Sequence, residues 1–204
     1  MEQERKMGFG KLFIISAPSG AGKTSLVQEI LKEYGQKYSL KRTITYTTRP
    51  PREGEIDGEH YHFISVDEFK DKIDQNFFIE WSTWYDHYYG SPLSTLKGIE
   101  EGVSYIMVLD RLGAKEVLQV CSQAVLIWIE PPSIKELERR LLGRGDNPHS
   151  VQGRLRKAAV EIQQERDEQF YKYHIINDDL SVAVCDLKAV LAKELEKRAY
   201  SPSS

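Results

Sequence analysis

One run of eight residues near the N-terminus has the composition of a phosphate-binding loop. Gly20 and Gly22 let the backbone curl without side-chain clashes, so that successive N–H groups can face phosphate oxygens from one concave side. Lys23 has the length to reach the β- and γ-phosphates, and the hydroxyl of Thr24 is a ligand that suits Mg²⁺. The pattern usually opens on glycine, where this chain has alanine, and it predicts binding of a nucleoside triphosphate. The members of the run are Ala17, Pro18, Ser19, Gly20, Ala21, Gly22, Lys23 and Thr24.

Two groups of arginines supply further cations for phosphate chemistry. Arg49 and Arg52 flank Pro50 and Pro51, and these prolines lower the entropy cost of holding a guanidinium fork for a phosphate monoester. Arg42 belongs to the same cluster. The chain has 28 basic and 31 acidic residues, so this local clustering favours phosphate handling over general nucleic-acid binding. The second group consists of Arg139, Arg140, Arg144, Arg154 and Arg156.

Apolar runs and amphipathic patterns alternate along the chain, which is typical of an α/β domain with a parallel sheet. The phosphate-binding run stands between a strand that ends at Ser16 and a helix at 25–34, which we expect Gly35 to end. Ser133 and Glu136 form the pattern of a capping box at the start of another helix. Strands are expected at 11–16, 103–109, 124–129 and 174–177, and further helices at 112–120, 134–142, 151–170 and 182–199.

The stretch 43–91 interrupts this alternation and is rich in Thr, Tyr, Phe and Gly. Short β-like runs at 61–64 and 77–81 favour a β-rich insertion. Ser65 and Glu68 predict the start of one short helix inside it.

Several motifs occur in an order that resembles the guanylate kinase family, over about residues 10–190. The resemblance implies a P-loop NTPase core with a parallel sheet flanked by helices, together with a β-rich GMP-binding insertion and a helical lid. The motifs are the Ala-Pro-Ser-Gly-Ala-Gly-Lys-Thr loop, Thr47-Thr48-Arg49-x-Pro51-Arg52-x-Gly54-Glu55, Gly58-x-x-Tyr61-x-Phe63, Phe78-x-Glu80, Tyr88-Tyr89-Gly90-Ser91, Gly143-Arg144-Gly145 and Ile176-Asn177-Asp178-Asp179.

The same resemblance divides the chain. It implies a kinase-like domain at 10–190, followed by the end of the last helix and a tail at 191–204, while the charged start of the chain predicts a disordered lead at 1–9. Within the domain the core would comprise 10–42 and 92–190, the GMP-binding insertion about 43–91 and the lid about 139–156.

The activity implied is transfer of the γ-phosphate of ATP to GMP, giving ADP and GDP, in purine nucleotide metabolism and GMP recycling. Mg²⁺ would enter as Mg-ATP, held by Thr24, while the whole phosphate-binding run and Asn177 would bind ATP. The acceptor is a phosphate oxygen that is already anionic, so no general base is needed. The residues expected to be catalytic are Lys23, Arg140, Arg144 and Arg154.

On the acceptor side, Glu80 matches the family's guanine-reading glutamate. Guanine presents N1–H and N2–H₂ donors on one edge, and one carboxylate can accept from both. Adenine presents an acceptor at N1 and would leave a buried Glu80 unpaired, which permits discrimination of ~10⁴ or more. Thr45 matches a hydroxyl that bonds guanine O6. The GMP phosphate would be held by Arg49, Arg52, Tyr61 and Tyr89, and the pocket closed by Gly90 and Ser91.

One position departs from the family pattern. Relatives commonly have Asp-x-Asp at the end of the third core strand, where this chain has Val108-Leu109-Asp110. Asp110 is kept, and it either contacts guanine or orients water molecules on Mg²⁺.

Two other functions remain open at this point. A catalytically silent guanylate-kinase-like interaction module would tend to lose the loop lysine and the phosphate-binding arginines, whereas Lys23, Arg49, Arg52 and Arg144 are present. A P-loop kinase for a phosphorylated sugar is disfavoured by Glu80 and the tyrosines, which suit a base.

Other features of the sequence bound location and partners. No apolar run approaches ~20 residues, so we expect no membrane span. The charged start and two cysteines without metal spacing, Cys121 and Cys185, predict a cytoplasmic protein with partly buried, reduced thiols. No residue visibly reads a ribose 2′-hydroxyl, so dGMP stays open beside GMP as an acceptor, and the oligomeric state is not predicted.

Overall fold

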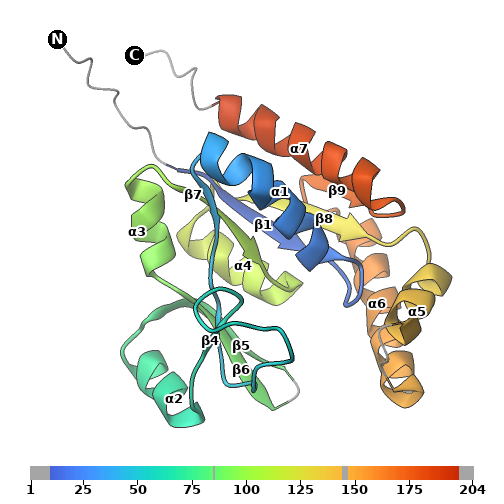
Figure 1. Cartoon of the computed structure of the whole chain (residues 1–204), viewed down its shortest axis with the longest axis horizontal. Coiled ribbons are helices and arrows are strands. Elements are labelled where there is room, and N and C mark those ends of the chain that lie inside the picture. The colour runs from blue at the N-terminus through green and yellow to red at the C-terminus, as the bar shows by residue number, and fades with distance from the viewer. Residues whose placement is uncertain (1–9, 85, 144–146, 198–204) are drawn as a thin grey trace. The chain divides into compact units, whose positions relative to one another are not determined.

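The computed structural model describes residues 10–84, 86–143 and 147–197. It divides into two compact units that take alternate parts of the chain (Figure 1). The first unit is formed by Ser39–Ala124 and the segment that ends at Leu12, and the second by Phe13–Tyr38 and the chain from Val125 onward. Of the predicted parts, the lead at 1–9 and the last residues of the tail lie outside the described residues.

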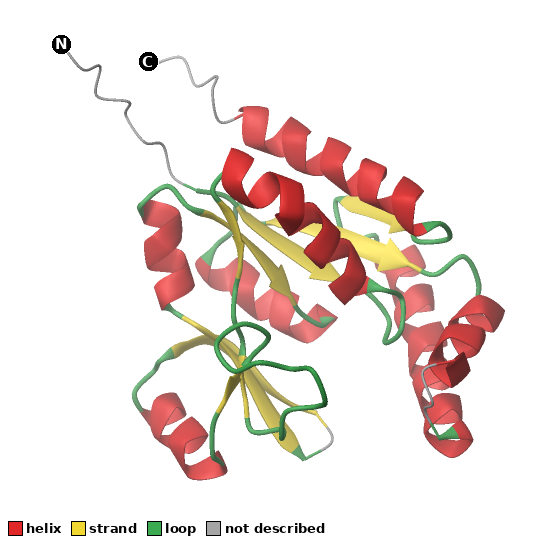
Figure 2. Ribbon diagram, in the orientation of Figure 1, coloured by secondary structure: helices red, strands yellow, loops and turns green. Residues whose placement is uncertain are grey.

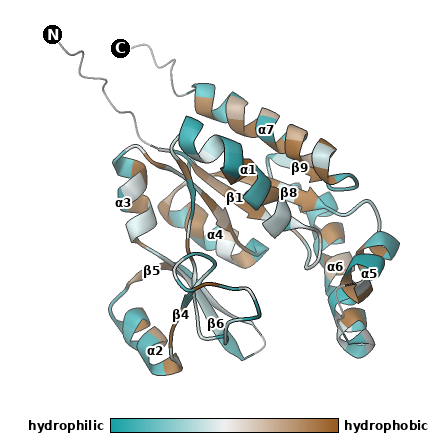
Figure 3. Ribbon diagram, in the orientation of Figure 1, coloured by the Kyte–Doolittle hydropathy of each residue, from teal (hydrophilic) through white to brown (hydrophobic). Residues whose placement is uncertain are grey.

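The second unit contains parallel strands in the order β1, β8, β9. Every residue of β1 is buried, and five of the six residues of β8 are buried, as expected for strands covered on both faces. Figure 3 shows both strands as mainly hydrophobic. The predicted parallel arrangement is therefore confirmed. The bounds are Leu12–Ser16 for β1, Val125–Glu130 for β8 and Tyr173–Ile176 for β9.

The helices of this unit overlap the predicted ones, with ends that differ by up to three residues (Figure 2). The last two helices begin two or three residues earlier than predicted and end two or three residues earlier. Gly35 does not end the first helix, which runs on to Lys37 behind a buried stripe that includes Leu26, Ile30 and Tyr34. Packing on α7, through buried residues such as Leu187, outweighs the ~1 kcal/mol by which glycine disfavours a helix. The bounds are Lys23–Lys37 for α1, Ile134–Gly143 for α5, Pro148–Glu168 for α6 and Leu180–Glu196 for α7.

Helices α5 and α6 pack against each other through a small apolar cluster. The predicted capping box at the start of α5 is half right. The Ser133 hydroxyl accepts a hydrogen bond from the Glu136 backbone N–H, but the Glu136 carboxylate accepts from Arg139 and Arg140 instead of turning back. The apolar cluster consists of Leu137, Leu141, Val151 and Ala158, with Leu155 packed against it.

The first unit contains the predicted β-rich insertion, built as a sheet in the order β4, β3, β6, β5. Strands β5 and β6 form an antiparallel hairpin in which Glu80 pairs with Ser91. Aromatic rings link this sheet to α2: the Phe69 ring stacks on Phe78 with ring centres 4.6 Å apart and lies tilted against Tyr88 at 5.2 Å. The capping box of Ser65 and Glu68 at the start of α2 is confirmed. The bounds are Tyr46–Thr47 for β3, His62–Phe63 for β4, Val66–Asp74 for α2, Phe78–Trp84 for β5 and His87–Pro92 for β6.

The rest of the first unit comprises the parallel pair β2 and β7 with the helices α3 and α4. Helix α3 was not predicted, because its seven residues, with Gly98 inside, carry too little apolar periodicity. Helix α4 begins at an Asp110 N-cap and packs against β5. The bounds are Leu40–Arg42 for β2, Ser94–Glu100 for α3, Ser104–Val108 for β7 and Arg111–Val120 for α4.

The fold bears on the predictions about membrane spans and about the two cysteines. Among the helices that the structure describes, none combines the length and apolar character needed to cross a membrane. Both cysteines are free, as expected, but Cys185 is exposed and only Cys121 is partly buried.

Candidate functional site

The predicted phosphate-binding loop joins β1 to α1 in the second unit. Gly20 and Gly22 have φ values of +92° and +91°, in the left-handed region where side chains are strained. Gly22 is the N-cap of α1, and the loop therefore leads directly into a helix N-terminus, where backbone N–H groups attract anions. The local geometry is that of a phosphate cradle.

Two polar side chains of the first helical turn lie at this cradle. The Lys23 ammonium donates to the backbone oxygens of Ala17 at 2.5 Å and Pro18 at 3.3 Å, so it lies folded over the loop that precedes it. Thr24 follows it and is exposed. A bound phosphate can compete with these neutral carbonyl groups for the ammonium, since charge-assisted hydrogen bonds are the stronger ones.

Asn177 supports the loop from the end of β9. Its side chain is 4% exposed, and its Nδ2 donates to the Ala21 carbonyl oxygen at 2.7 Å. A Cβ atom at Gly22 would lie 2.3 Å from the same Nδ2. The glycine therefore serves two purposes: it permits a left-handed turn, and it leaves room for the amide that braces the turn. Asn177 was predicted to bind ATP, and in the structure its amide donates to the loop that precedes α1.

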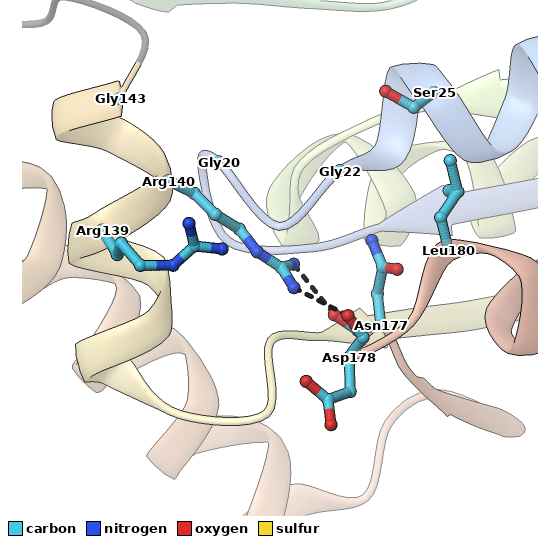
Figure 4. A pocket seen from close by; sticks show the side chains of 9 residues that line it. All are labelled: Gly20, Gly22, Ser25, Arg139, Arg140, Gly143, Asn177, Asp178 and Leu180. Atoms are coloured by element: carbon cyan, nitrogen blue, oxygen red, sulfur yellow. Dashed lines mark hydrogen bonds between the residues drawn. The ribbon is translucent and has the colours of Figure 1, made fainter.

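A cavity of about 370 Å³ opens beside this loop. Figure 4 shows the Arg140 guanidinium directed at the chain where β9 leads into α7. Arg140 Nη1 donates to the Asn177 carbonyl oxygen at 2.8 Å, and Nη2 donates to the Asp178 carbonyl oxygen at 3.0 Å. The cavity is lined by Gly20, Gly22, Ser25, Arg139, Arg140, Gly143, Asn177, Asp178 and Leu180.

Glu136 holds the two neighbouring arginines of α5. Its carboxylate accepts from Arg139 at 2.7 Å and from the Arg140 Nε at 2.8 Å. These hydrogen bonds, from Arg139 first and then Arg140, lower the pKa of Glu136 to about 2. Sequence reasoning missed Glu136 as a site residue, although its spacing of three and four residues from the arginines is the helical signal for such a pair.

The other two predicted lid arginines have different outcomes. Arg154, on α6, donates from Nη2 and Nε to the Ser19 hydroxyl at 2.7 and 3.2 Å, so it lies at the phosphate-binding loop. Arg144 lies outside the described residues. We call the loop at 17–24, with Asn177, Arg140 and Arg154, the loop site.

The first unit carries a separate constellation around Glu80. Glu80 is 5% exposed, and its Oε1 accepts from the Ser91 hydroxyl at 2.5 Å. Desolvation raises the pKa of Glu80 to about 7, with further upward contributions from Asp110 and Glu116 against a lowering by Ser91. A buried carboxylate with one oxygen engaged by a hydroxyl is poised to accept from further donors.

Arg49 is held by an acidic partner that the sequence analysis left unassigned. Its Nη2 lies 2.9 Å from both carboxylate oxygens of Glu55, and its Nη1 donates to the Pro50 carbonyl oxygen at 2.7 Å. The Arg52 backbone N–H also donates to Glu55 at 2.7 Å, whereas the Arg52 side chain is exposed. Burial alone would raise the pKa of Glu55, but the hydrogen bonds from Arg52 and Arg49 lower it below its ordinary value.

Aromatic rings support this arginine. The Arg49 guanidinium lies 5.4 Å from the Tyr61 ring centre, and Arg42 lies 5.7 Å from the same ring. Tyr89 meets Tyr61 edge to face at 6.3 Å. Two of the three arginines of the predicted cluster thus share one tyrosine with a second tyrosine beside it. We call Glu80, Ser91, Arg49, Glu55 and Tyr61, with their neighbours Tyr89 and Asp110, the Glu80 site.

The remaining predicted residues of this unit have clear structural roles. Gly90 has no room for a side chain, because a Cβ atom there would lie 2.8 Å from Phe78. Asp110 caps α4, with its Oδ1 accepting from the Gly113 N–H at 2.9 Å. Thr45 is partly buried, and its carbonyl oxygen accepts from the His62 N–H at 2.9 Å.

A metal ion would need ligands beyond those that the protein offers. Within the described part of the chain, no group of three or more His, Cys, Asp or Glu side chains is arranged to hold one. Thr24 offers a hydroxyl oxygen, a hard ligand of the kind that Mg²⁺ prefers, and Mg²⁺ commonly takes its other ligands from phosphates and water. The donor set therefore fits a metal that arrives with a nucleotide.

Comparison with known proteins gives one consistent family. The sequence model of the guanylate kinase family matches residues 9–194. Guanylate kinases from Shewanella sp. (strain MR-7) and Geobacter sulfurreducens are 40% and 43% identical to this chain over 91% of its length, covering 88% and 89% of their own. The crystal structure of guanylate kinase from Anaplasma phagocytophilum aligns with a TM-score of 0.72 at 27% identity, over 92% of this chain and 87% of that one. A phosphate-binding loop, a buried carboxylate on a separate β-rich unit and these matches lead to one conclusion: the chain belongs to the guanylate kinase family.

Proposed function

We propose that this chain transfers the γ-phosphate of ATP to GMP, giving ADP and GDP. The observation that carries the choice of acceptor is the buried carboxylate of Glu80. An acceptor oxygen of the GMP phosphate attacks the γ-phosphorus, the bond from that phosphorus to the β,γ-bridging oxygen breaks, and ADP leaves with the electron pair. The relatives that match are named as kinases, and nothing favours the catalytically silent alternative.

Glu80 would select guanine because its carboxylate still needs hydrogen-bond donors and guanine supplies them. Ser91 already donates to one carboxylate oxygen, and the site is nearly closed to water. Guanine brings N1–H and N2–H₂, which satisfy the remaining acceptor capacity, and their binding favours the charged form of the carboxylate. Adenine brings no matching donor at N1 and would leave the buried group unsatisfied, at a cost of ~1–3 kcal/mol or more.

Arg49 would hold the phosphate of GMP, with Arg52, Tyr61 and Tyr89 beside it. Support comes from the ring contact of Arg49 with Tyr61 and from the hydrogen bonds of Arg49 Nη2 to both Glu55 carboxylate oxygens, which fix the guanidinium in place. Glu55 then acts as a positioning partner for Arg49. Thr45 and Asp110 complete the proposed base contacts.

The loop site would hold ATP. Support comes from the left-handed glycines and the helix N-terminus for phosphate oxygens, and from Lys23, Arg154 and Arg140 as cations close to that loop. Mg²⁺ would be held by Thr24 and the nucleotide, and when bound it neutralises charge on the β- and γ-phosphates. The chain's own residues position the phosphates and offset the charge of the transferring group. A cytoplasmic location stays a prediction.

The test is a substrate screen with the full chain. ADP release is measured with ATP and each nucleoside monophosphate in turn: GMP, dGMP, AMP, CMP and UMP, with and without Mg²⁺. We expect turnover with GMP, far weaker turnover with AMP, CMP and UMP, and a requirement for Mg²⁺. Turnover of AMP equal to that of GMP, or none with any acceptor, would contradict the proposal.

A further inference from the structure

Gly113 stands against the carboxylate of Glu80. It lies in the first turn of α4, is buried, and packs where that helix meets β5. A Cβ atom built on Gly113 would lie 3.1 Å from Glu80 Oε2 and 3.6 Å from Glu80 Cδ. The first distance is tighter than ordinary van der Waals contact, so a side chain there would press on the carboxylate.

The backbone gives no reason for glycine at this position. Gly113 is helical, and it is absent from the glycines of positive φ. Glycine is among the least favourable residues inside a helix, so alanine would suit the local conformation better. A methyl group at Gly113 would have too little space, because the nearest atom to it would be an oxygen of Glu80.

Glu80 has little freedom to retreat from such a group. Its Oε1 is held by Ser91, its partner in the β5–β6 hairpin, and its side chain is 5% exposed. The Asp110 cap would survive the change, because Asp110 Oδ1 lies 3.6 Å from the built Cβ atom, an ordinary contact. The steric clash would therefore displace the carboxylate of Glu80.

We propose that Gly113 determines acceptor specificity: the absence of a side chain there reserves the room in which the Glu80 carboxylate meets the two donors of the guanine edge. Gly113 is a positioning residue, since it acts through Glu80. This inference rests on the proposed function. It predicts that adding one methyl group displaces the carboxylate and weakens discrimination by the base without weakening use of ATP.

The experiment compares Gly113→Ala with Gly153→Ala, a helical glycine of α6 at which a Cβ atom meets nothing within 4 Å. The kcat/KM is measured for GMP and for IMP, whose hypoxanthine keeps N1–H but lacks the 2-amino group, and KM is measured for ATP. We expect the GMP to IMP ratio to fall at least ~5-fold in Gly113→Ala, because one buried donor pairing is disturbed. The ratio should not change in Gly153→Ala, and KM for ATP should stay within about twofold in both.

A second comparison assigns the effect to Glu80. In the Glu80→Ala background the carboxylate is gone, and Gly113→Ala should then leave the GMP to IMP ratio unchanged, which gives a non-additive cycle. If Gly113→Ala alone is too unstable to assay, the double variant must melt at a higher temperature, because removing the carboxylate relieves the contact. The inference would be overturned if the GMP to IMP ratio did not change in Gly113→Ala, or if it fell equally in the Glu80→Ala background. It would also be overturned if Gly113→Ala were unstable and the added Glu80→Ala did not raise its melting temperature. Wild-type turnover of GMP tests the proposed function separately, so the two failures can be told apart.

Discussion

In the proposed function, the loop site and the Glu80 site recognise their ligands by opposite means. In the loop site, backbone N–H groups and cations face the ligand, and the cations rest on protein oxygens: Lys23 on Ala17 and Pro18, Arg154 on Ser19. In the Glu80 site the proposed selecting group is a carboxylate that burial makes hard to ionise. Cationic groups attract the phosphates of any nucleotide, whatever its base. A buried hydrogen-bond acceptor, in contrast, disfavours every base that does not offer it a donor.

The two sites also differ in how the chain builds them. The loop is one contiguous run, supported from a distance by Asn177. The Glu80 site takes Glu80 and Ser91 from two strands of a hairpin and Asp110 from the N-cap of a helix. A contiguous site depends on local conformation, and a dispersed one depends on packing.

The largest expected effect is at Lys23. Replacing Lys23 by Ala removes the ammonium that lies over the loop, and we expect kcat to fall at least ~10²-fold, equal to ~3 kcal/mol of transition-state stabilisation. Lys32→Ala is the matched control, since Lys32 is an exposed residue of the same helix that pairs only locally with Glu29. Steady-state kinetics with ATP and GMP measures both. Near-normal turnover in Lys23→Ala would remove the loop from the mechanism.

Asn177→Asp tests the hydrogen bond by which the Asn177 amide supports the loop at Ala21. The change replaces the Nδ2 donor by an oxygen that faces the Ala21 carbonyl oxygen, and it adds negative charge near the phosphates. We expect KM for ATP to rise by about 10-fold, as for a lost buried hydrogen bond, while KM for GMP changes little.

Asp178→Asn serves as the control for this change, because Asp178 is exposed and its interaction with Arg140 uses only its backbone oxygen. Asp178→Asn changes the charge in the opposite direction, so a pure charge effect would lower KM for ATP about as much as Asn177→Asp raises it. Such opposite and equal effects would show that charge alone, and not the hydrogen bond to Ala21, affects ATP.

The Glu80 site should show a dependence on pH that the loop site lacks. With a pKa raised to about 7 before GMP binds, Glu80 is mostly protonated at pH 6 and mostly charged at pH 8. Only the charged form accepts both guanine donors, so we expect GMP affinity to rise by about 10-fold over this range.

The GMP phosphate itself titrates near pH 6, and Glu80→Gln isolates that contribution. The variant should retain only the weaker dependence that comes from the phosphate. Parallel pH profiles of the wild type and Glu80→Gln, measured by GMP titration, would rule out ionisation of Glu80 as the cause.

The contrast between contiguous and dispersed sites also explains what the sequence could predict. The loop, the parallel strands and the β-rich insertion follow from local pattern and were predicted. Nothing in the sequence indicates that Asn177 points its amide at Ala21, or that Glu55 pairs with Arg49, because both depend on side-chain direction after packing. Gly113 was unremarkable in the sequence, since only the fold brings it against Glu80. Gly35 misled the prediction of a helix end because tertiary burial outweighed local preference.

The central claim is that one buried carboxylate chooses the acceptor base, and calorimetric titration of Glu80→Gln tests it most directly. The amide would turn a donor toward the guanine donors, so at pH 8 we predict that GMP affinity falls at least ~30-fold, about 2 kcal/mol, while ATP affinity stays within about twofold of the wild type. Unchanged GMP affinity in the variant, or an equal loss for ATP and GMP, would contradict the account.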